Sequence, residues 1–182
     1  MTGTASSTPS LAERLAARLR LVPDFPSKGI MFQDVTPVLA DAPLFAAAID
    51  AMVEPWRGQG ITHVAGIESR GFIFAAPVAL ALGAGFVVIR KPGKLPWRRV
   101  SQEYQLEYGV DRLEIHEDAC PRGAKVLVVD DVLATGGTAR AACELVEALG
   151  GAVVGCAFLL EIRDLDGRAQ LQRRRVDVLI GR

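Results

Sequence analysis

Two adjacent carboxylates, Asp130 and Asp131, are separated by only two residues from a glycine-containing segment, Ala134–Thr138. The preceding run, Val126–Val129, is continuously apolar, which is typical of a fully buried strand. Glycines let backbone N–H groups turn inward, and a helix that begins there places the positive end of its dipole beside an anion. The segment therefore suits a phosphate, whereas the carboxylates suit a vicinal diol or a bound Mg²⁺. Together they predict a site for a ribose 5-phosphate.

This pattern differs from two common nucleotide-binding motifs, because the sequence contains neither GxxxxGKS/T nor GxGxxG. The alternative is an ordinary strand–turn–helix connection in which an aspartate caps the helix. Such a connection requires neither two acids nor a double glycine between threonines. We therefore take every residue of the segment as a candidate phosphate ligand: Ala134, Thr135, Gly136, Gly137 and Thr138.

Two further polar segments also follow apolar runs. Glu68–Gly71 comes after Thr62–Ile67, and Arg90–Lys94 comes after Gly85–Ile89. Ligands of parallel sheets bind at the carboxyl ends of the strands, so we expect both segments to lie at the same edge as the acid pair. This topology predicts one composite site.

The composition of these two segments suits an oxyanion, because backbone donors and guanidinium groups bind one well. Alternatives are an ion pair between Glu68 and Arg70, and a nucleic-acid contact by the basic run up to Arg99. Only Trp97 offers a stacking surface there, so a polyphosphate is favoured, with Arg98 and Arg99 expected to be solvated. The candidate ligands are Glu68, Ser69, Arg70, Arg90, Lys91 and Lys94.

Strand and helix patterns alternate along the chain, which predicts an α/β fold with a parallel sheet. A capping box of Ser10 and Glu13 begins an amphipathic first helix, and residues 101–115 suit a hairpin arm. Further strands are expected at 62–67, 85–89, 126–129, 152–160 and 176–180. Further helices are expected at 44–56, 72–82, 138–149 and 164–173.

Bulk composition excludes several classes of protein. Lys plus Arg and Asp plus Glu both number 21, so the zero formal charge gives no field that attracts nucleic acid or an anionic membrane. No apolar run approaches the ~20 residues that span a bilayer. The cysteines, Cys120, Cys143 and Cys156, show no CxxC spacing, which favours buried thiols in a reducing cytoplasm.

The sequence VLVVDDVLATGGT (126–138) resembles the phosphoribosyl pyrophosphate (PRPP) motif of the type I phosphoribosyltransferases. Four further stretches resemble the members of that family that act on adenine: PDFPSKGIMFQDVTPVL, GIESRGFIFAAPVALALG, VIRKPGKLP and YQLEYGVDRLEIHEDA. The resemblance runs in order from about Val22 to Leu160, and the last ~20 residues match weakly.

This resemblance implies a single domain over 1–182 with a mainly parallel central sheet flanked by helices. It implies a tail at 1–9, a base-binding hood at 10–40 and a flexible catalytic arm at 91–112. The implied reaction is transfer of the phosphoribosyl group from PRPP to adenine, giving AMP and pyrophosphate, with Mg²⁺. Relatives are commonly homodimers, so a homodimer is expected, without a nucleic-acid or membrane partner.

The resemblance also implies individual roles. It makes Glu107 the catalytic acid/base and places Tyr108 over the reacting centre. It places Ile30, Phe32, Gln33 and Val132 around adenine. Asp130 and Asp131 take the ribose, and Mg²⁺ is carried mainly by PRPP, with these two acids as its only candidate protein ligands.

One departure and two alternatives remain. Many relatives have Arg where this chain has Gln33, which alters the site only if that side chain contacts the ligand. A 6-oxo purine would require a donor where adenine requires an acceptor. A PRPP-sensing regulator that binds nucleic acid would require an added binding domain or a broad basic face.

Overall fold

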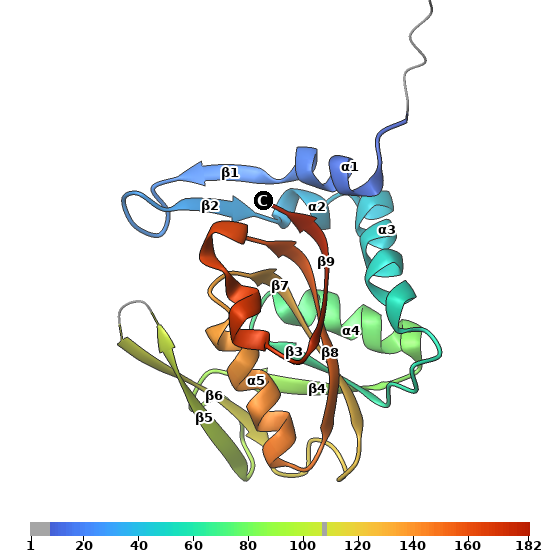
Figure 1. Cartoon of the computed structure of the whole chain (residues 1–182), viewed down its shortest axis with the longest axis vertical. Helices are drawn as coiled ribbons and strands as arrows, with labels where there is room; N and C mark the ends of the chain where they lie inside the picture. The colour runs from blue at the N-terminus through green and yellow to red at the C-terminus, as the bar shows by residue number, and fades with distance from the viewer. Residues whose placement is uncertain (1–7, 107–108) are drawn as a thin grey trace, which may run out of the picture. The chain divides into compact units, whose positions relative to one another are not determined.

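The computed structural model describes residues 8–106 and 109–182 (Figure 1). The chain forms two compact units, of which the first ends at Ala48 and the second comprises Ile49–Arg182. The boundary falls inside helix α3 (Ala42–Val53).

The first unit begins with the predicted capping box of helix α1 (Leu11–Arg18). The Ser10 hydroxyl accepts a hydrogen bond from the Glu13 N–H at 3.2 Å, and the Glu13 carboxylate accepts one from the Ser10 N–H at 2.7 Å. Two orphan donors at the helix start are thereby satisfied. Leu15 is fully buried, as its position on the apolar face predicts.

A two-stranded antiparallel sheet follows in the described part of this unit, built from β1 (Arg20–Pro23) and β2 (Met31–Asp34). The short helix α2 (Thr36–Leu39) comes next. β1 was not expected, because its residues look like the end of the amphipathic helix. The helix ends earlier, at Arg18, and the chain pairs Val22 with Phe32 instead.

The second unit holds, in its described residues, a seven-stranded sheet in the order β5-β6-β4-β3-β7-β8-β9. The strands are β3 (His63–Ile67), β4 (Gly85–Arg90), β5 (Arg99–Leu106), β6 (Gly109–His116), β7 (Lys125–Leu133), β8 (Ala152–Glu161) and β9 (Arg175–Gly181). The helical segments are α4 (Gly71–Leu82), α5 (Gly137–Ala148) and the 3₁₀ turns η1 (Glu54–Trp56), η2 (Arg163–Leu165) and η3 (Gly167–Leu171).

The expected parallel sheet is confirmed for β4, β3, β7, β8 and β9. The remaining two strands run antiparallel: β5 and β6 form the expected hairpin, and β6 pairs with the edge of β4. One expectation was wrong: the segment 164–173, expected to be a helix, contains the 3₁₀ turns η2 and η3. The strand expected at 126–129 is confirmed and extends to Leu133.

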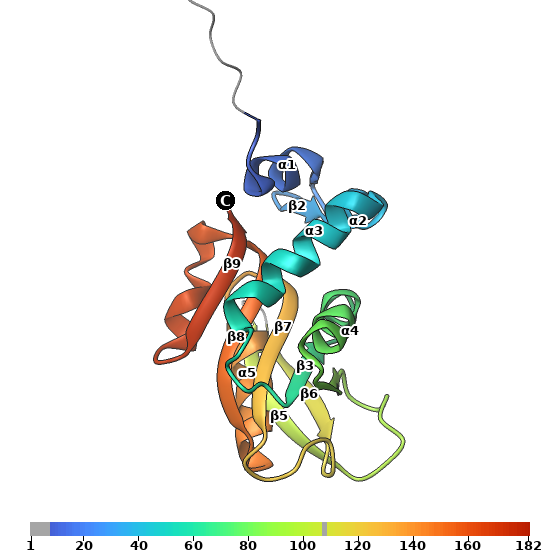
Figure 2. The same cartoon turned by 90° about the vertical axis from the view of Figure 1, so that its right-hand side faces the viewer.

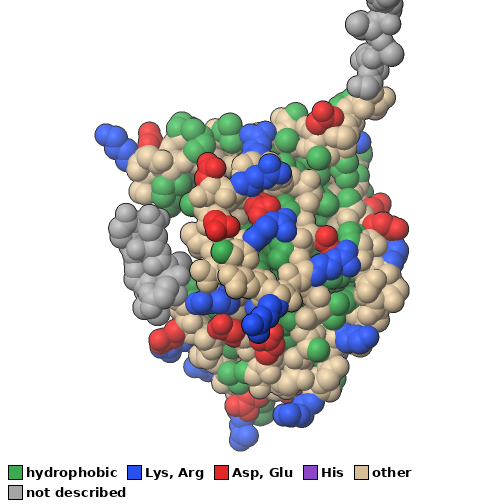
Figure 3. Space-filling view, viewed as in Figure 1, with side chains coloured by type: hydrophobic (Ala, Val, Ile, Leu, Met, Phe, Trp, Pro, Cys, Tyr) green, Lys and Arg blue, Asp and Glu red, His purple; other side chains and the backbone are tan. Residues whose placement is uncertain are grey.

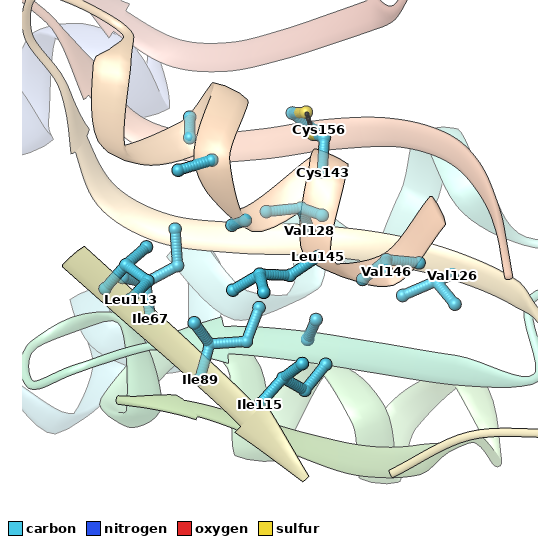
Figure 4. Packing of buried hydrophobic residues seen from close by; sticks show 14 of the residues in the cluster. Ile67, Ile89, Leu113, Ile115, Val126, Val128, Cys143, Leu145, Val146 and Cys156 are labelled. Carbon is cyan, nitrogen blue, oxygen red and sulfur yellow. Dashed lines mark hydrogen bonds between the residues drawn. The ribbon is translucent and has the colours of Figure 1, made fainter. Parts of the chain in front are cut away.

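Helices α4 and α5 cover opposite faces of this sheet (Figures 1 and 2). Side chains alternate between faces along a strand. Accordingly Ile67, Val126 and Val128 pack in one buried cluster with Leu145 and Val146 of α5 (Figure 4). Because both faces are covered, the central strands are largely apolar, with Asp130 and Asp131 of β7 as acidic exceptions.

No helix among the described residues has the length and apolarity to cross a membrane.

Candidate active site

Three neighbouring strands, β4, β3 and β7, deliver the three polar segments to one edge of the sheet, as the topology predicts. Direct contacts link the segments. Arg70, after β3, forms an ion pair with Asp131 of β7. Glu68 forms ion pairs with Arg90, the last residue of β4, and with Lys94, which follows β4. The candidate ribose, pyrophosphate and basic residues therefore belong to one connected cluster.

The acid pair lies inside β7 rather than at its end, which corrects the sequence-based placement. Asp131 is buried against the Arg70 guanidinium. Asp130 accepts a hydrogen bond from the Asp131 N–H at 2.9 Å, and its Oδ1 lies against Gly71. A Cβ at Gly71 would be 2.6 Å from that oxygen, so the close approach of α4 to Asp130 requires glycine there.

The charge of Asp130 is poorly compensated by the protein. Burial, and then the neighbouring Asp131 carboxylate, raise the pKa of Asp130 well above its ordinary value, although the Asp131 N–H and Arg70 act in the opposite direction. A hydroxyl donor or a cation brought by a ligand would stabilise the ionised form. The acid pair is thus suited to bind a diol or share a metal ion.

Glu68 has the opposite environment. Its carboxylate accepts hydrogen bonds from the Lys91 N–H at 2.9 Å and from Arg90 Nε at 3.2 Å, besides its ion pair with Lys94. Burial raises the pKa of Glu68, but these donors outweigh it and lower the pKa to about 2. Glu68 therefore stays ionised and gathers the cations of the following strand around the start of the Glu68–Gly71 segment.

Lys91 links this cluster to the hairpin arm. Its ammonium donates to the Tyr104 hydroxyl at 2.6 Å and forms an ion pair with Asp111. Tyr104 and Asp111 are partners across β5 and β6, and the Tyr104 hydroxyl donates to the Asp111 carboxylate at 2.9 Å. Burial lowers the pKa of Lys91, but the two partners outweigh this and raise it. The arm and the basic segment thus share one cation.

Arg99 and Glu114 show a second connection that the sequence did not indicate. Arg99 was expected to be a solvated charge, but it forms an ion pair with Glu114 at 3.0 Å, and Glu114 is buried. The Gly93 N–H donates to the same carboxylate at 3.0 Å. Strand alternation places Glu114 on the face of β6 opposite to Leu113 and Ile115. The basic loop covers that face, so Glu114 anchors the loop instead.

The phosphate segment enters α5 as expected. Gly136 is the N-cap, with a left-handed φ of 82°, and no side chain caps the helix. Gly137 is buried, Thr138 is half-buried and Thr135 is exposed. The start of a helix leaves backbone N–H groups without intrahelical acceptors, so this turn offers donors to an anion.

The candidate adenine residues are divided between the units. Ile30, Phe32 and Gln33 lie in the first unit, where Phe32 packs edge-on against Phe25 with ring centroids 5.0 Å apart. The Oε1 atom of Gln33 is buried without a hydrogen-bond partner among the described residues. Val132 is half-buried on β7 of the second unit. Glu107 and Tyr108 lie outside the described residues.

The chain is similar in sequence and fold to known phosphoribosyltransferases. The family model of the phosphoribosyl transferase domain matches residues 38–179. A curated adenine phosphoribosyltransferase of Myxococcus xanthus is 59% identical over 94% of this chain and 93% of its own length. An adenine phosphoribosyltransferase structure from Thermoanaerobacter pseudethanolicus superimposes with a TM-score of 0.92, at 49% identity, over 95% of this chain and 100% of that one.

A third relative has ligands in its structure. The adenine phosphoribosyltransferase of Saccharomyces cerevisiae, complexed with D-2,5-dideoxy-2,5-imino-altritol 1,6-bisphosphate and adenine, has a TM-score of 0.87 at 42% identity. The match covers 93% of this chain and 98% of the yeast chain. Sequence, fold and the clustered acid, basic and glycine segments agree, and this chain belongs to the adenine phosphoribosyltransferases of the phosphoribosyl transferase family.

Proposed function

We propose that this protein transfers the 5-phosphoribosyl group of PRPP to adenine, giving AMP and pyrophosphate in purine salvage. The bond from C1′ of the ribose to pyrophosphate breaks, and a bond from C1′ to a ring nitrogen of adenine forms while that nitrogen loses its proton. The observation that carries the proposal is the contact of the acid pair on β7 with the segment after β3, beside the glycine turn of α5.

The donor PRPP would occupy the edge of the sheet formed by β4, β3 and β7. The glycine turn 134–138 binds its 5-phosphate through backbone N–H groups and the hydroxyls of Thr135 and Thr138. The ribose hydroxyls donate to Asp130 and Asp131. These hydrogen bonds supply the compensation that Asp130 lacks within the protein, as its raised pKa indicates.

Pyrophosphate would be bound by the basic cluster. Ser69 and Arg70 provide donors after β3, and cations are provided at and after the end of β4 by Arg90, Lys91 and Lys94. Glu68 contributes by holding these cations in place, because its own charge would repel a phosphate. Lys91 then exchanges its contacts with the arm for the ligand, and negative charge that develops on the leaving group is stabilised.

Adenine would be read mainly by the hood formed by residues 10–40. β2 is an edge strand of its sheet, so half of its peptide groups face away from β1 and suit the polar edge of a base. Ile30, Phe32 and Gln33 lie in or beside this strand, and the family resemblance assigns Phe32 and Val132 to the faces of the purine. In this proposal, residues of the first unit mainly determine which base is accepted.

The catalytic roles at the tip of the arm rest on the family resemblance. Glu107 is proposed to assist the proton transfer at the purine ring, and Tyr108 to cover the reacting centre, within an arm that extends over 91–112. A carboxylate on a closing arm both moves a proton and helps to exclude water.

Mg²⁺ is proposed as the cofactor. The described residues gather no group of three or more His, Cys, Asp or Glu side chains able to hold a metal ion. The acid pair, Asp130 and Asp131, would instead provide the protein contacts of a cation that takes most of its ligands from PRPP and water. Bound Mg²⁺ supplies positive charge that neutralises pyrophosphate.

A homodimer is proposed as the working assembly. Ile73 and Leu80 stand seven residues apart on α4, hence on one face, and expose 41% and 82% of their surface. A second copy covering this apolar face would explain its exposure.

A reducing cytoplasm is proposed as the compartment, because three cysteines without CxxC spacing suit neither a disulfide framework nor a zinc site.

A nucleic-acid-binding regulator is the other class that the sequence leaves open. On the face shown in Figure 3, Lys and Arg side chains are interleaved with Asp and Glu rather than gathered in a broad basic patch. The formal net charge is zero. These features favour a small polyphosphate ligand over nucleic acid.

The test is to incubate the protein with Mg²⁺, PRPP and one nucleobase at a time, and to identify the nucleotide by chromatography. We expect AMP with adenine and at most trace product with hypoxanthine, guanine or xanthine. Product from a 6-oxo purine alone would overturn the choice of adenine. Addition of excess EDTA tests the cofactor, and undiminished turnover would contradict a requirement for Mg²⁺.

A further inference from the structure

The 3₁₀ turn η3 lies directly against the proposed 5-phosphate loop. A Cβ at Gly167 would overlap the Ala134 carbonyl oxygen and lie 3.0 Å from Leu133 Cδ1. Reciprocally, a Cβ at Gly136 would overlap the Gly167 carbonyl oxygen and lie 2.9 Å from Gln170 Cβ. The two backbones are therefore packed against each other, with a glycine on each side of the contact.

The turn is itself held firmly to the sheet and to α5. Leu171, its last residue, is only 1% exposed and belongs to the buried cluster that contains α5. Arg168 donates to the buried Glu161 carboxylate at 2.7 Å and to the Val176 carbonyl oxygen at 3.1 Å. These contacts join η3 to the ends of β8 and β9, so the turn is a fixed support for the loop.

The loop requires such a support. Its glycine cap, Gly136, has left-handed backbone geometry and no side chain to hold it, so packing must determine where the N–H groups point. Donors bind a phosphate well only when they are held in place before the ligand arrives. The surface of η3 that faces Ala134 and Gly136 provides this restraint.

We propose that η3 is a positioning element for the 5-phosphate loop, with Gly167 as its positioning residue. The proposal rests on the proposed function, because it presumes that residues 134–138 bind the 5-phosphate of PRPP. A side chain at 167 would displace the Ala134 carbonyl, and with it the donors that follow, while the pyrophosphate cluster around Glu68 and Arg90 would stay as it is.

Gly155 offers a matched control. It lies on β8, and a Cβ there would overlap Trp56 Cη2 and lie 2.8 Å from the Arg175 carbonyl oxygen. The clash is similar in size to that at Gly167, but its neighbours are not part of the loop. Gly155→Ala should therefore cost stability without altering phosphate binding.

The experiment compares Gly167→Ala, Gly155→Ala and the unaltered protein in binding of ribose 5-phosphate and of pyrophosphate by titration calorimetry, with Tm recorded for each. For Gly167→Ala we expect ribose 5-phosphate affinity to fall about tenfold, the effect of losing one charge-assisted hydrogen bond. Pyrophosphate affinity should stay within about twofold, as should kcat at saturating PRPP. Arg168→Ala adds no clash and should lower ribose 5-phosphate affinity by a smaller factor. If Gly167→Ala does not fold, Arg168→Ala replaces it in the comparison.

Two results would overturn the proposal. One is an equal loss of affinity for both ligands; the other is unchanged ribose 5-phosphate binding with a Tm loss like that of Gly155→Ala. Failure of the proposed function is separate, because it would show as absence of AMP formation by the unaltered protein. Ribose 5-phosphate binding by that protein, and its weakening in Gly167→Ala, is measured without turnover.

Discussion

The ends of β3 and β7 lie side by side in the sheet, yet their carboxylates have opposite environments. Glu68, after β3, is surrounded by Arg90, Lys94 and the Lys91 N–H, which lower its pKa to about 2. Asp130, within β7, has another carboxylate as its neighbour, and burial and that charge raise its pKa. The fold compensates the negative charge of Glu68 but not that of Asp130.

This difference indicates that Glu68 has a structural role and that Asp130 binds the ligand. Glu68 has no remaining need for a ligand, so it serves to hold cations. Asp130 is stabilised when a ligand donates hydrogen bonds to it. The unfavourable free energy of its uncompensated charge in the free protein is therefore offset when the ligand binds. Two carboxylates on adjacent strands thus have different functions because their surroundings differ.

The largest effect should follow from Asp130→Asn. The amide keeps the shape but removes the charge that accepts the ribose hydroxyls, and losing charge from about two such hydrogen bonds corresponds to a loss of roughly a hundredfold in kcat/KM. Steady-state assays of AMP formation with varied PRPP measure it. Turnover equal to that of the unaltered protein would remove Asp130 from the ribose site.

The same variant has an opposite effect on stability. A carboxyl whose folded pKa is raised stabilises the fold only at low pH, and this contribution is lost as the pH rises through the folded pKa. At pH 8 the buried Asp130 carboxyl therefore destabilises the folded protein relative to the unfolded chain, and Asp130→Asn should unfold at an equal or higher Tm. A clear decrease in Tm at pH 8 would contradict the raised pKa.

Glu68→Gln should lose stability at neutral pH. The folded pKa of Glu68, about 2, lies below its ordinary value of 4.5, so its contribution is fully present above pH 4.5 and is lost as the pH falls toward 2. Allowing for the half-exposed Lys94, we expect a loss of about 2 kcal/mol in the free energy of unfolding, or roughly 5 °C in Tm.

Urea unfolding of both proteins at pH 7 and pH 3 provides the check for Glu68→Gln. The difference between them should shrink at the lower pH. A difference that stays constant would mean that Glu68 acts through packing and not through its charge.

Gly71→Ala separates the two acids. The added Cβ would lie 2.6 Å from Asp130 Oδ1 and so displace that carboxylate, whereas no atom of Glu68 is among its three nearest neighbours. We expect kcat/KM for PRPP to fall about tenfold, since small displacements of a binding group cost that much or more. Gly83→Ala, at the other end of α4, is the control: its Cβ meets nothing within 4 Å, but the left-handed φ of 64° strains an alanine there, so it destabilises the helix end without displacing Asp130.

The smallest effect concerns the hood. Gln33 Oε1 is a buried acceptor without a partner among the described residues, and the amino group of adenine is a donor. Gln33→Leu should therefore raise the KM for adenine about threefold, the low end of a neutral hydrogen bond, and leave the KM for PRPP unchanged. An unchanged KM for adenine would assign recognition to the backbone of β2.

Local patterns in the sequence predicted most of the fold. The apolar run before Asp130 and the glycines before α5 correctly indicated a buried strand and a helix start, and three polar segments after strands were correctly brought together. Residues 164–173 were assigned wrongly, because their composition is compatible with a helix but the chain is held close to Ala134 and Gly136 by tight packing that only the tertiary structure reveals.

The supporting residues were also hidden from sequence reasoning. Glu114 alternates with buried Leu113 and Ile115, which is the pattern of a solvent-facing acid. Its burial depends on a loop that folds over it and supplies Arg99 and the Gly93 N–H. Such partners are distant in sequence, so no local pattern indicates them.

The most direct test of the account is a crystal structure of the protein with Mg²⁺ and PRPP. We predict the 5-phosphate on the backbone N–H groups of residues 134–138, the ribose hydroxyls on Asp130 and Asp131, and pyrophosphate beside Arg70 and Arg90, with Glu68 still paired to its cations. Pyrophosphate seated on the glycine turn, or ribose hydroxyls without contact to Asp130, would contradict the division between scaffold and binding acid.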